Sequence, residues 1–137
     1  MEERRAHVLQ ADGASRGNPG PAGAGAVLFA PDGSVVAELR KHLGHATNNR
    51  AEYEALVMGL EEAKRRGVGD LVVRLDSELL VKQMTGAYRI RNAALQPFAQ
   101  RALRLIGELA ARIEHVPRAR NAHADRLANE AIDDAVG

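Results

Sequence analysis

A short strand that ends in a carboxylate, at Asp12, is the feature that most constrains this chain. Residues 8–11 have the character of a strand, and Asp12-Gly13 opens a segment rich in glycine and proline that runs to Pro21. Glycine tolerates backbone angles that other residues avoid, so we expect the chain to turn or bulge directly after the carboxylate. The pattern predicts that Asp12 lies at the end of a strand and faces a gap in the fold.

Length and composition fit one globular domain. The chain has 137 residues, of which 45% are hydrophobic and 27% charged, and its formal net charge is +1. A chain of this length supports one domain with a real core, so we expect a single domain over residues 1–137. Because the chain has no overall basic field, any nucleic-acid partner must be recognised by local patches.

The composition also limits the chemistry and the location. The sequence contains no cysteine, which excludes disulfides, thiol catalysis and cysteine-ligated metals. No apolar run approaches the roughly 18 residues of a membrane span. Residues 1–5 lead into a strand rather than into the apolar region of a signal peptide. We therefore expect a cytoplasmic protein with no membrane partner. No obligate protein partner is evident from the sequence, and we expect a monomer.

Hydrophobic periodicity, turn residues and helix caps divide the chain into strands and helices. Strands are predicted over 7–12, 24–29, 35–40, 71–76 and 112–116. Helices are predicted over 48–67, 78–84 and 93–111, and a final helix begins at Asn121, which is expected to cap it. The segment 117–120 is predicted to be a basic loop. This order predicts an α/β fold with a five-stranded mixed sheet, in which three antiparallel strands precede parallel crossovers and helices flank the sheet.

Two acids are expected to meet at one edge of this sheet. Asp12 and Asp76 end strands that the crossover makes parallel neighbours, and neighbouring strands lie about 5 Å apart. Open α/β sheets carry their sites at the carboxyl ends of their strands. The pair therefore marks a candidate site.

Glu52 and Asp125 are candidates to join the pair. On its helix, Glu52 shares a face with the apolar positions that must lie against the sheet, so its carboxylate points toward the core. The alternative for Glu52 is a capping-box acid in Asn49-x-x-Glu52, and the alternative for Asp125 is an acid that complements a helix dipole. The coincidence with the two strand-end acids favours a shared site.

Clustered carboxylates predict a divalent cation. Two carboxylates about 4 Å apart repel by on the order of 4 kcal/mol near a protein surface, so several in one pocket must take up protons or bind cations. Hard oxygen donors favour Mg²⁺ or Mn²⁺, and a pair of such ions clamps the attacking and departing oxygens of a phosphodiester. We therefore expect metal-assisted phosphoryl hydrolysis.

Segments of the chain resemble the signature segments of type 1 ribonuclease H, in the family's order. They are residues 12–20 (DGASRGNPG), 47–52 (TNNRAE), 75–77 (LDS) and 121–129 (NAHADRLAN). The resemblance implies a ribonuclease H-like fold and hydrolysis of the RNA strand of an RNA–DNA hybrid, leaving a 3′ hydroxyl and a 5′ phosphate. It also implies two Mg²⁺ or Mn²⁺ ions that activate a water and stabilise the leaving 3′ oxygen. Asp12 would bridge both ions, Glu52 and Asp76 would complete one site, and Asp125 the other.

Recognition of RNA requires contacts to the 2′ hydroxyl, which both donates and accepts hydrogen bonds. The resemblance implies this role for the amides of Asn18, Asn48 and Asn49. It also implies that Thr47 holds a phosphate and that Asn92, at the start of the long helix, contacts substrate. The alternatives are local, namely turn formation by Asn18 and helix capping by the others.

The chain departs from the pattern of many bacterial members just before Asp125. Their longer loop carries a mobile histidine that assists proton transfer or product release, whereas residues 117–120 contain none. Arg118 is our candidate substitute, a donor to phosphate that cannot act as a base. His115 and His123 are expected to be packing or surface residues.

The basic helical protrusion of some relatives is also absent from the sequence. We expect a weak, salt-sensitive grip on the substrate, carried by Lys82, Arg89, Arg91, Arg118, Arg120 and Arg126. A solvated charged face is the alternative for these residues.

Three functions are considered from the sequence. An active ribonuclease H is favoured. The second is a related nuclease that accepts double-stranded RNA, or the nuclease half of a longer bifunctional polypeptide. The third, a non-catalytic nucleic-acid module, is disfavoured because all four acids are retained.

Overall fold

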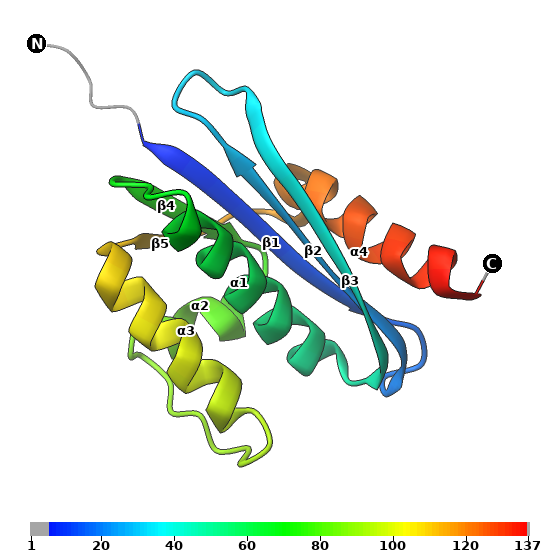
Figure 1. The fold of residues 1–137 in the computed structure, drawn as a ribbon. Coiled ribbons are helices and arrows are strands. Elements are labelled where there is room, and N and C mark those ends of the chain that lie inside the picture. The colour runs from blue at the N-terminus through cyan, green and yellow to red at the C-terminus, as the bar shows by residue number, and fades with distance from the viewer. Residues whose placement is uncertain (1–5, 137) are drawn as a thin grey trace, which may run out of the picture.

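The computed structural model describes residues 6–136 as a sheet covered by helices on both faces (Figure 1). The strands are β1 (His7–Ser15), β2 (Gly20–Phe29), β3 (Val35–Ala46), β4 (Leu71–Leu75) and β5 (Arg112–His115). The helices are α1 (Asn48–Arg65), α2 (Glu78–Met84), α3 (Gln96–Leu109), the 3-10 helix η1 (Arg118–Asn121) and α4 (Ala122–Val136). The prediction for residues 1–5 lies outside the described residues.

The sheet has the predicted mixed topology. Its five strands lie in the order β3-β2-β1-β4-β5. β1 pairs antiparallel with β2 and β2 with β3, whereas β1 with β4 and β4 with β5 are parallel. The predicted meander and the predicted parallel neighbours of β1 and β4 are therefore confirmed.

The main core lies between the sheet and the helices α1 and α3. It is built from buried leucines, valines and alanines, with Tyr53 the largest fully buried side chain. The apolar stripe of α1 makes this packing possible, because its buried residues recur at helical spacing. Within the described residues, no helix is both long enough and apolar enough to cross a membrane.

Several element boundaries differ from the prediction. β1 continues to Ser15, because its pairing with β2 runs on as far as Ser15 and Ala22. Asp12 therefore lies inside a strand, and the prediction that it ends one is wrong. α3 begins at Gln96 rather than at residue 93, since the Asn92 carboxamide oxygen accepts from Ala94 N at 2.9 Å in a turn.

The helix α4 packs on β2 where the strand carries glycines. A Cβ added to Gly23 would lie 2.3 Å from the Ala128 carbonyl oxygen, and one added to Gly25 would lie 2.3 Å from that of Ala124. These distances are far below van der Waals contact, so only glycine permits α4 to lie this close to the sheet.

We predict that Gly25→Ala destabilises the protein by about 1–3 kcal/mol, because the added methyl group must push α4 away from β2. Urea denaturation measures the loss. The matched control is Gly107→Ala in α3, where a Cβ would meet no atom within 4 Å. This control should be neutral or stabilising by up to about 1 kcal/mol. Equal stability of the two variants would contradict the prediction.

Candidate active site

Asp12 and Asp76 lie side by side where the sheet opens between β1 and β4. The parallel pairing of these strands ends at Gln10 and Arg74, two residues before the two acids. Asp76 is the first residue after β4, so its backbone lies beyond the pairing with β1. The predicted meeting of these acids is observed.

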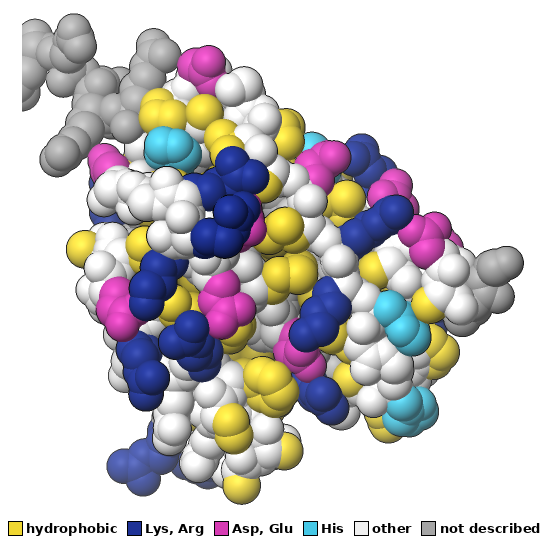
Figure 2. All heavy atoms as spheres, in the orientation of Figure 1, with side chains coloured by type: hydrophobic (Ala, Val, Ile, Leu, Met, Phe, Trp, Pro, Cys, Tyr) yellow, Lys and Arg dark blue, Asp and Glu magenta, His cyan; other side chains and the backbone are white. Residues whose placement is uncertain are grey.

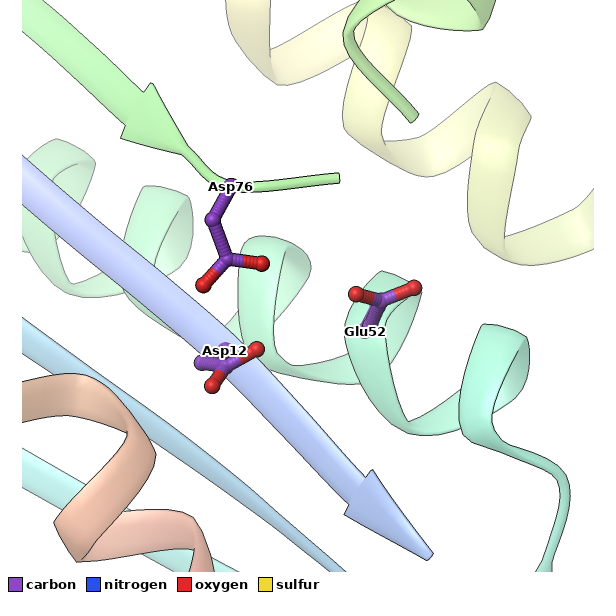
Figure 3. Close-up of side chains that lie close together, drawn as sticks. All are labelled: Asp12, Glu52 and Asp76. Carbon is purple, nitrogen blue, oxygen red and sulfur yellow. The ribbon is translucent and has the colours of Figure 1, made fainter. Parts of the chain in front are cut away.

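Glu52 joins them because α1 comes unusually close to β1. A Cβ on Gly13 would lie 2.2 Å from Ala51 C and 2.3 Å from Glu52 N. One oxygen from each of Asp12, Glu52 and Asp76 lies within 4.8 Å of the others. Figure 3 shows the three carboxylates converging from β1, α1 and the segment after β4.

Asp125 lies in the first turn of α4. Asp12 in β1 is paired with Gly25 in β2, and α4 packs against Gly25 because that residue has no side chain. Asp125 lies close enough to Asp12 to raise its pKa, although Asp125 is not part of the tight group of three. The structure therefore gathers all four predicted acids, with Asp12 in the middle.

A series of polar side-chain contacts connects Asp125 to the loop after β1. Asn129 Nδ2 donates to the backbone oxygen of Asp125 at 3.0 Å and to its Oδ1 at 3.4 Å. Arg16 Nη2 donates to Asn129 Oδ1 at 3.2 Å, and Arg16 Nη1 is paired with Asp133 at 2.8 Å. The loop after β1 is thereby tied to α4.

The electrostatics of the cluster oppose ionisation. Burial raises the pKa of Asp12 to about 8, and the carboxylates of Asp76, Asp125 and Glu52 add to this shift. Burial raises the pKa of Glu52 to about 7, with Asp76 adding to the shift and the positive charge of Arg118 opposing it. Both acids are thus held partly protonated near neutral pH unless positive charge is supplied.

The residues present fit a divalent metal ion. Their donors are carboxylate oxygens alone, gathered within 4.8 Å, and this is the ligand set of Mg²⁺ and Mn²⁺. A bound cation would also favour the ionised forms that burial opposes.

Arg118 lies in η1, close enough to Glu52 to lower its pKa. The segment predicted as a loop is thus a 3-10 helix that carries a guanidinium to the acidic cluster. The side chains of the two nearby histidines contact groups other than the four carboxylates. His115 Nε2 lies 3.2 Å from the backbone oxygen of Asp76, and the His123 side chain contacts Glu38 and the ring of Phe29.

Apart from Arg118, the predicted substrate-binding residues lie in the loop after β1, around the start of α1 and before α3. Thr47 is the N-cap of α1 and accepts from Arg50 N at 3.2 Å. Capping by Asn48 and Asn49 is therefore wrong, since both lie inside the helix. The Asn18 carboxamide oxygen accepts from Asn48 N at 2.9 Å and so joins the loop after β1 to α1.

Thr47 and Asn92 line the same cavity of about 270 Å³, together with Arg50 and His45. The cavity contains donors for an anion, namely a hydroxyl, an amide and a guanidinium. Sequence reasoning predicted Thr47 and Asn92 but did not predict that they share one cavity.

Many of the surface basic residues are paired with acids. Figure 2 shows Lys and Arg side chains interspersed with acids over the face that carries α1 and α3. Of the six residues predicted to grip substrate, Lys82 pairs with Glu78 at 2.9 Å and Arg126 with Glu38 and Glu130. These two have the alternative role that the sequence left open, a solvated charged face.

Asn121 is the residue of the site that sequence reasoning misassigned. It was predicted to cap the last helix, but its side chain is fully buried and donates to Ala11 O at 2.9 Å and to Asp76 Oδ2 at 3.0 Å. Its position at the head of the fourth signature segment was the available signal. The cap prediction is wrong because η1 turns the side chain inward, toward β1 and β4.

Comparisons with known proteins agree with this geometry. A family model described as Reverse transcriptase-like matches residues 10–131. Ribonuclease HI of Halobacterium salinarum is 52% identical over 125 residues, or 90% of this chain. Bifunctional protein Rv2228c of Mycobacterium tuberculosis is 47% identical over 130 residues, or 93% of this chain. The chain spans 63% and 36% of the lengths of these two relatives.

A solved structure agrees over nearly its whole length. LC11-RNase H1 in complex with an RNA/DNA hybrid is 39% identical, with a TM-score of 0.90, over 96% of this chain and 99% of that one. The sheet order, the flanking helices and the acidic cluster define the ribonuclease H-like class of enzymes. The chain belongs to the type 1 ribonuclease H family.

The raised pKa values predict an unusual dependence of stability on pH. Without metal, the folded protein holds protons on Asp12 and Glu52 that the unfolded chain releases at their ordinary pKa values near 4. Stability should therefore fall as the pH rises from about 4 to about 8, by on the order of a few kcal/mol. Thermal melting in EDTA across this range tests the prediction.

Mg²⁺ or Mn²⁺ should restore most stability at pH 8, where the acids must ionise. The control is Asp12→Asn, which removes one titrating acid and one metal ligand. Its melting temperature should change less with pH and should respond less to metal. A wild-type protein whose stability in EDTA rises steadily over this range would contradict the prediction.

Proposed function

We propose that this protein is a metal-dependent endoribonuclease that hydrolyses the RNA strand of RNA–DNA hybrids and leaves 3′ hydroxyl and 5′ phosphate ends. The observation that carries the proposal is the convergence of Asp12, Glu52 and Asp76 within 4.8 Å, with Asp125 near enough to raise the pKa of Asp12. Its family membership and a hybrid-bound relative, LC11-RNase H1, support the substrate class.

We infer that these four acids would hold two divalent cations, Mg²⁺ or Mn²⁺. When bound, such ions supply Lewis-acid activation of a water and stabilisation of the departing 3′ oxygen. By holding the cations at one place on the sheet, the acids would fix the position at which the negatively charged scissile phosphate binds. Arg118 neutralises part of the charge on Glu52 and offers hydrogen-bond donors to a phosphate oxygen.

Substrate selection is assigned to residues around the start of α1. The amides of Asn18, Asn48 and Asn49 are proposed to contact 2′ hydroxyl groups, for which they supply both donors and acceptors. The cavity shared by Thr47 and Asn92 fits a backbone phosphate. None of the four acids lines this cavity.

A second candidate is the nuclease half of a bifunctional protein. This candidate is favoured by the match to Bifunctional protein Rv2228c, of which the chain spans 36%. In either case we infer that residues 1–137 form one ribonuclease H domain. One chain supplies all four acids, which supports a site that a monomer can form. The cytoplasmic location stays a prediction, and activity on double-stranded RNA stays the alternative to hydrolysis of the hybrid.

A cleavage panel tests the proposed function. RNA–DNA, RNA–RNA and DNA–DNA duplexes of the same sequence are incubated with Mg²⁺, Mn²⁺ or EDTA, and the products are resolved by size. Only the RNA strand of the hybrid should be cut, with no cleavage in EDTA. Asp12→Asn should lower the rate by more than about 100-fold, because even partners of metal ligands are worth 10- to 100-fold. Activity that survives in EDTA or in this variant would refute the metal mechanism.

Arg118→Ala should slow turnover by on the order of 10- to 100-fold and weaken hybrid binding much less. Without the guanidinium, the pKa of Glu52 rises further, so the acidic limb of the pH–rate profile should move to higher pH. Arg104→Ala, an exposed arginine of α3, is the matched control and should leave both unchanged. A loss confined to affinity would assign Arg118 to backbone grip alone.

A further inference from the structure

Asn121 is buried among the groups that form the acidic cluster. Its side chain is fully buried, and its Nδ2 donates to the backbone oxygen of Ala11 at 2.9 Å and to Asp76 Oδ2 at 3.0 Å. Ala11 directly precedes Asp12 in β1. A single amide group therefore bridges the strand that carries one acid and the carboxylate of another.

The orientation of this amide follows from its neighbours. Both groups that face Nδ2 are oxygens that can only accept, unless Asp76 is protonated, whereas Oδ1 has no hydrogen-bond partner among the described residues. Rotating the amide would bring Oδ1 against two oxygens and leave Nδ2 without either acceptor. Leaving Oδ1 without a partner costs free energy, and the two hydrogen bonds that Nδ2 donates offset this cost.

Asp76 needs such a restraint. The ladder between β1 and β4 ends at Gln10 and Arg74, so backbone pairing no longer sets the distance from Asp76 to Asp12. The carboxylates of Asp76 and Asp12 also repel each other, and this repulsion raises the pKa of Asp12. A buried donor that binds both Asp76 and β1 opposes this separation.

We propose that Asn121 is a positioning residue of this active site. It fixes Asp76 Oδ2 against β1 and leaves Asp76 Oδ1 available to a cation. Asn121 is also the last residue of η1, which begins at Arg118, so the same two bonds anchor the element that carries the guanidinium. The inference rests on the proposed function, because it concerns the same acids.

The test measures metal binding in the absence of nucleic acid. Free Mn²⁺ is titrated by electron paramagnetic resonance against wild type, Asn121→Leu and a control, Leu105→Ala. Leu branches at Cγ as Asn does and donates no hydrogen bond, although its side chain is larger. Leu105 is fully buried in α3, so its truncation destabilises the core without touching the acids. Urea denaturation of each protein supplies the matching stability.

Asn121→Leu should raise the Kd for Mn²⁺ by about 10-fold or more, the size expected when a partner of a metal ligand is lost. At saturating Mn²⁺, kcat on the hybrid should fall, while KM changes by less than about twofold. Leu105→Ala should keep the wild-type Kd despite its lower stability. Asn121→Ser, whose single hydroxyl hydrogen cannot serve both acceptors, should also weaken Mn²⁺ binding and decides the matter if the Leu variant does not fold.

Wild-type Mn²⁺ affinity in a folded Asn121 variant would overturn the inference and reduce Asn121 to a structural role. That failure is distinct from failure of the proposed function. If wild type itself neither binds Mn²⁺ nor cuts the hybrid, the acidic cluster is not a metal-dependent nuclease site.

Discussion

The close approach of two helices to the central strands is the constraint on which the site depends. On one face, the missing side chain of Gly13 lets the backbone of α1 come within a distance that any Cβ would block, and this brings Glu52 to the sheet. On the opposite face, Gly23 and Gly25 do the same for α4, which carries Asp125. Side chains alternate along a strand, so Asp12 and Gly13 face opposite sides of the sheet. Asp12 is therefore next to the place where α1 meets Gly13 and is paired with Gly25, where α4 packs. The acids meet because the helices on either face can touch backbone.

Bringing the acids together has an electrostatic cost that the rest of the fold must offset. Burial and mutual repulsion raise the pKa values of Asp12 and Glu52 to about 8 and about 7. An arrangement that is unfavourable by itself becomes favourable when a divalent cation is bound, so stability and metal affinity are linked. The apolar core between the sheet, α1 and α3 supplies the stability that permits this strain. Like-charge crowding in a buried place is typical of a functional site rather than of a structural one.

Hydrogen bonds from neighbouring polar groups hold three of the four acids. Asn121 holds Asp76, Asn129 holds Asp125, and the amide of Gly13 donates to Asp12 Oδ1 at 3.0 Å. Arg118 is the one guanidinium that influences Glu52 within the described residues. By contrast, many basic residues on the outer face of α1 and α3 are paired with acids (Figure 2). Positive charge near Glu52 is therefore provided by one specific residue, Arg118, rather than by a basic surface.

The sequence by itself determined the elements, their order and the acids that meet. Periodicity and turn residues depend on neighbours along the chain, which is why the sheet topology and the inward face of Glu52 were predictable. Only the tertiary structure decided that Asp12 lies within a strand, that Thr47 rather than Asn48 or Asn49 caps α1, and that Asn121 faces the site. The partners of Asn121 lie 110 and 45 residues away. No local pattern can specify such contacts, because they depend on where the packed backbone places a donor and its acceptors.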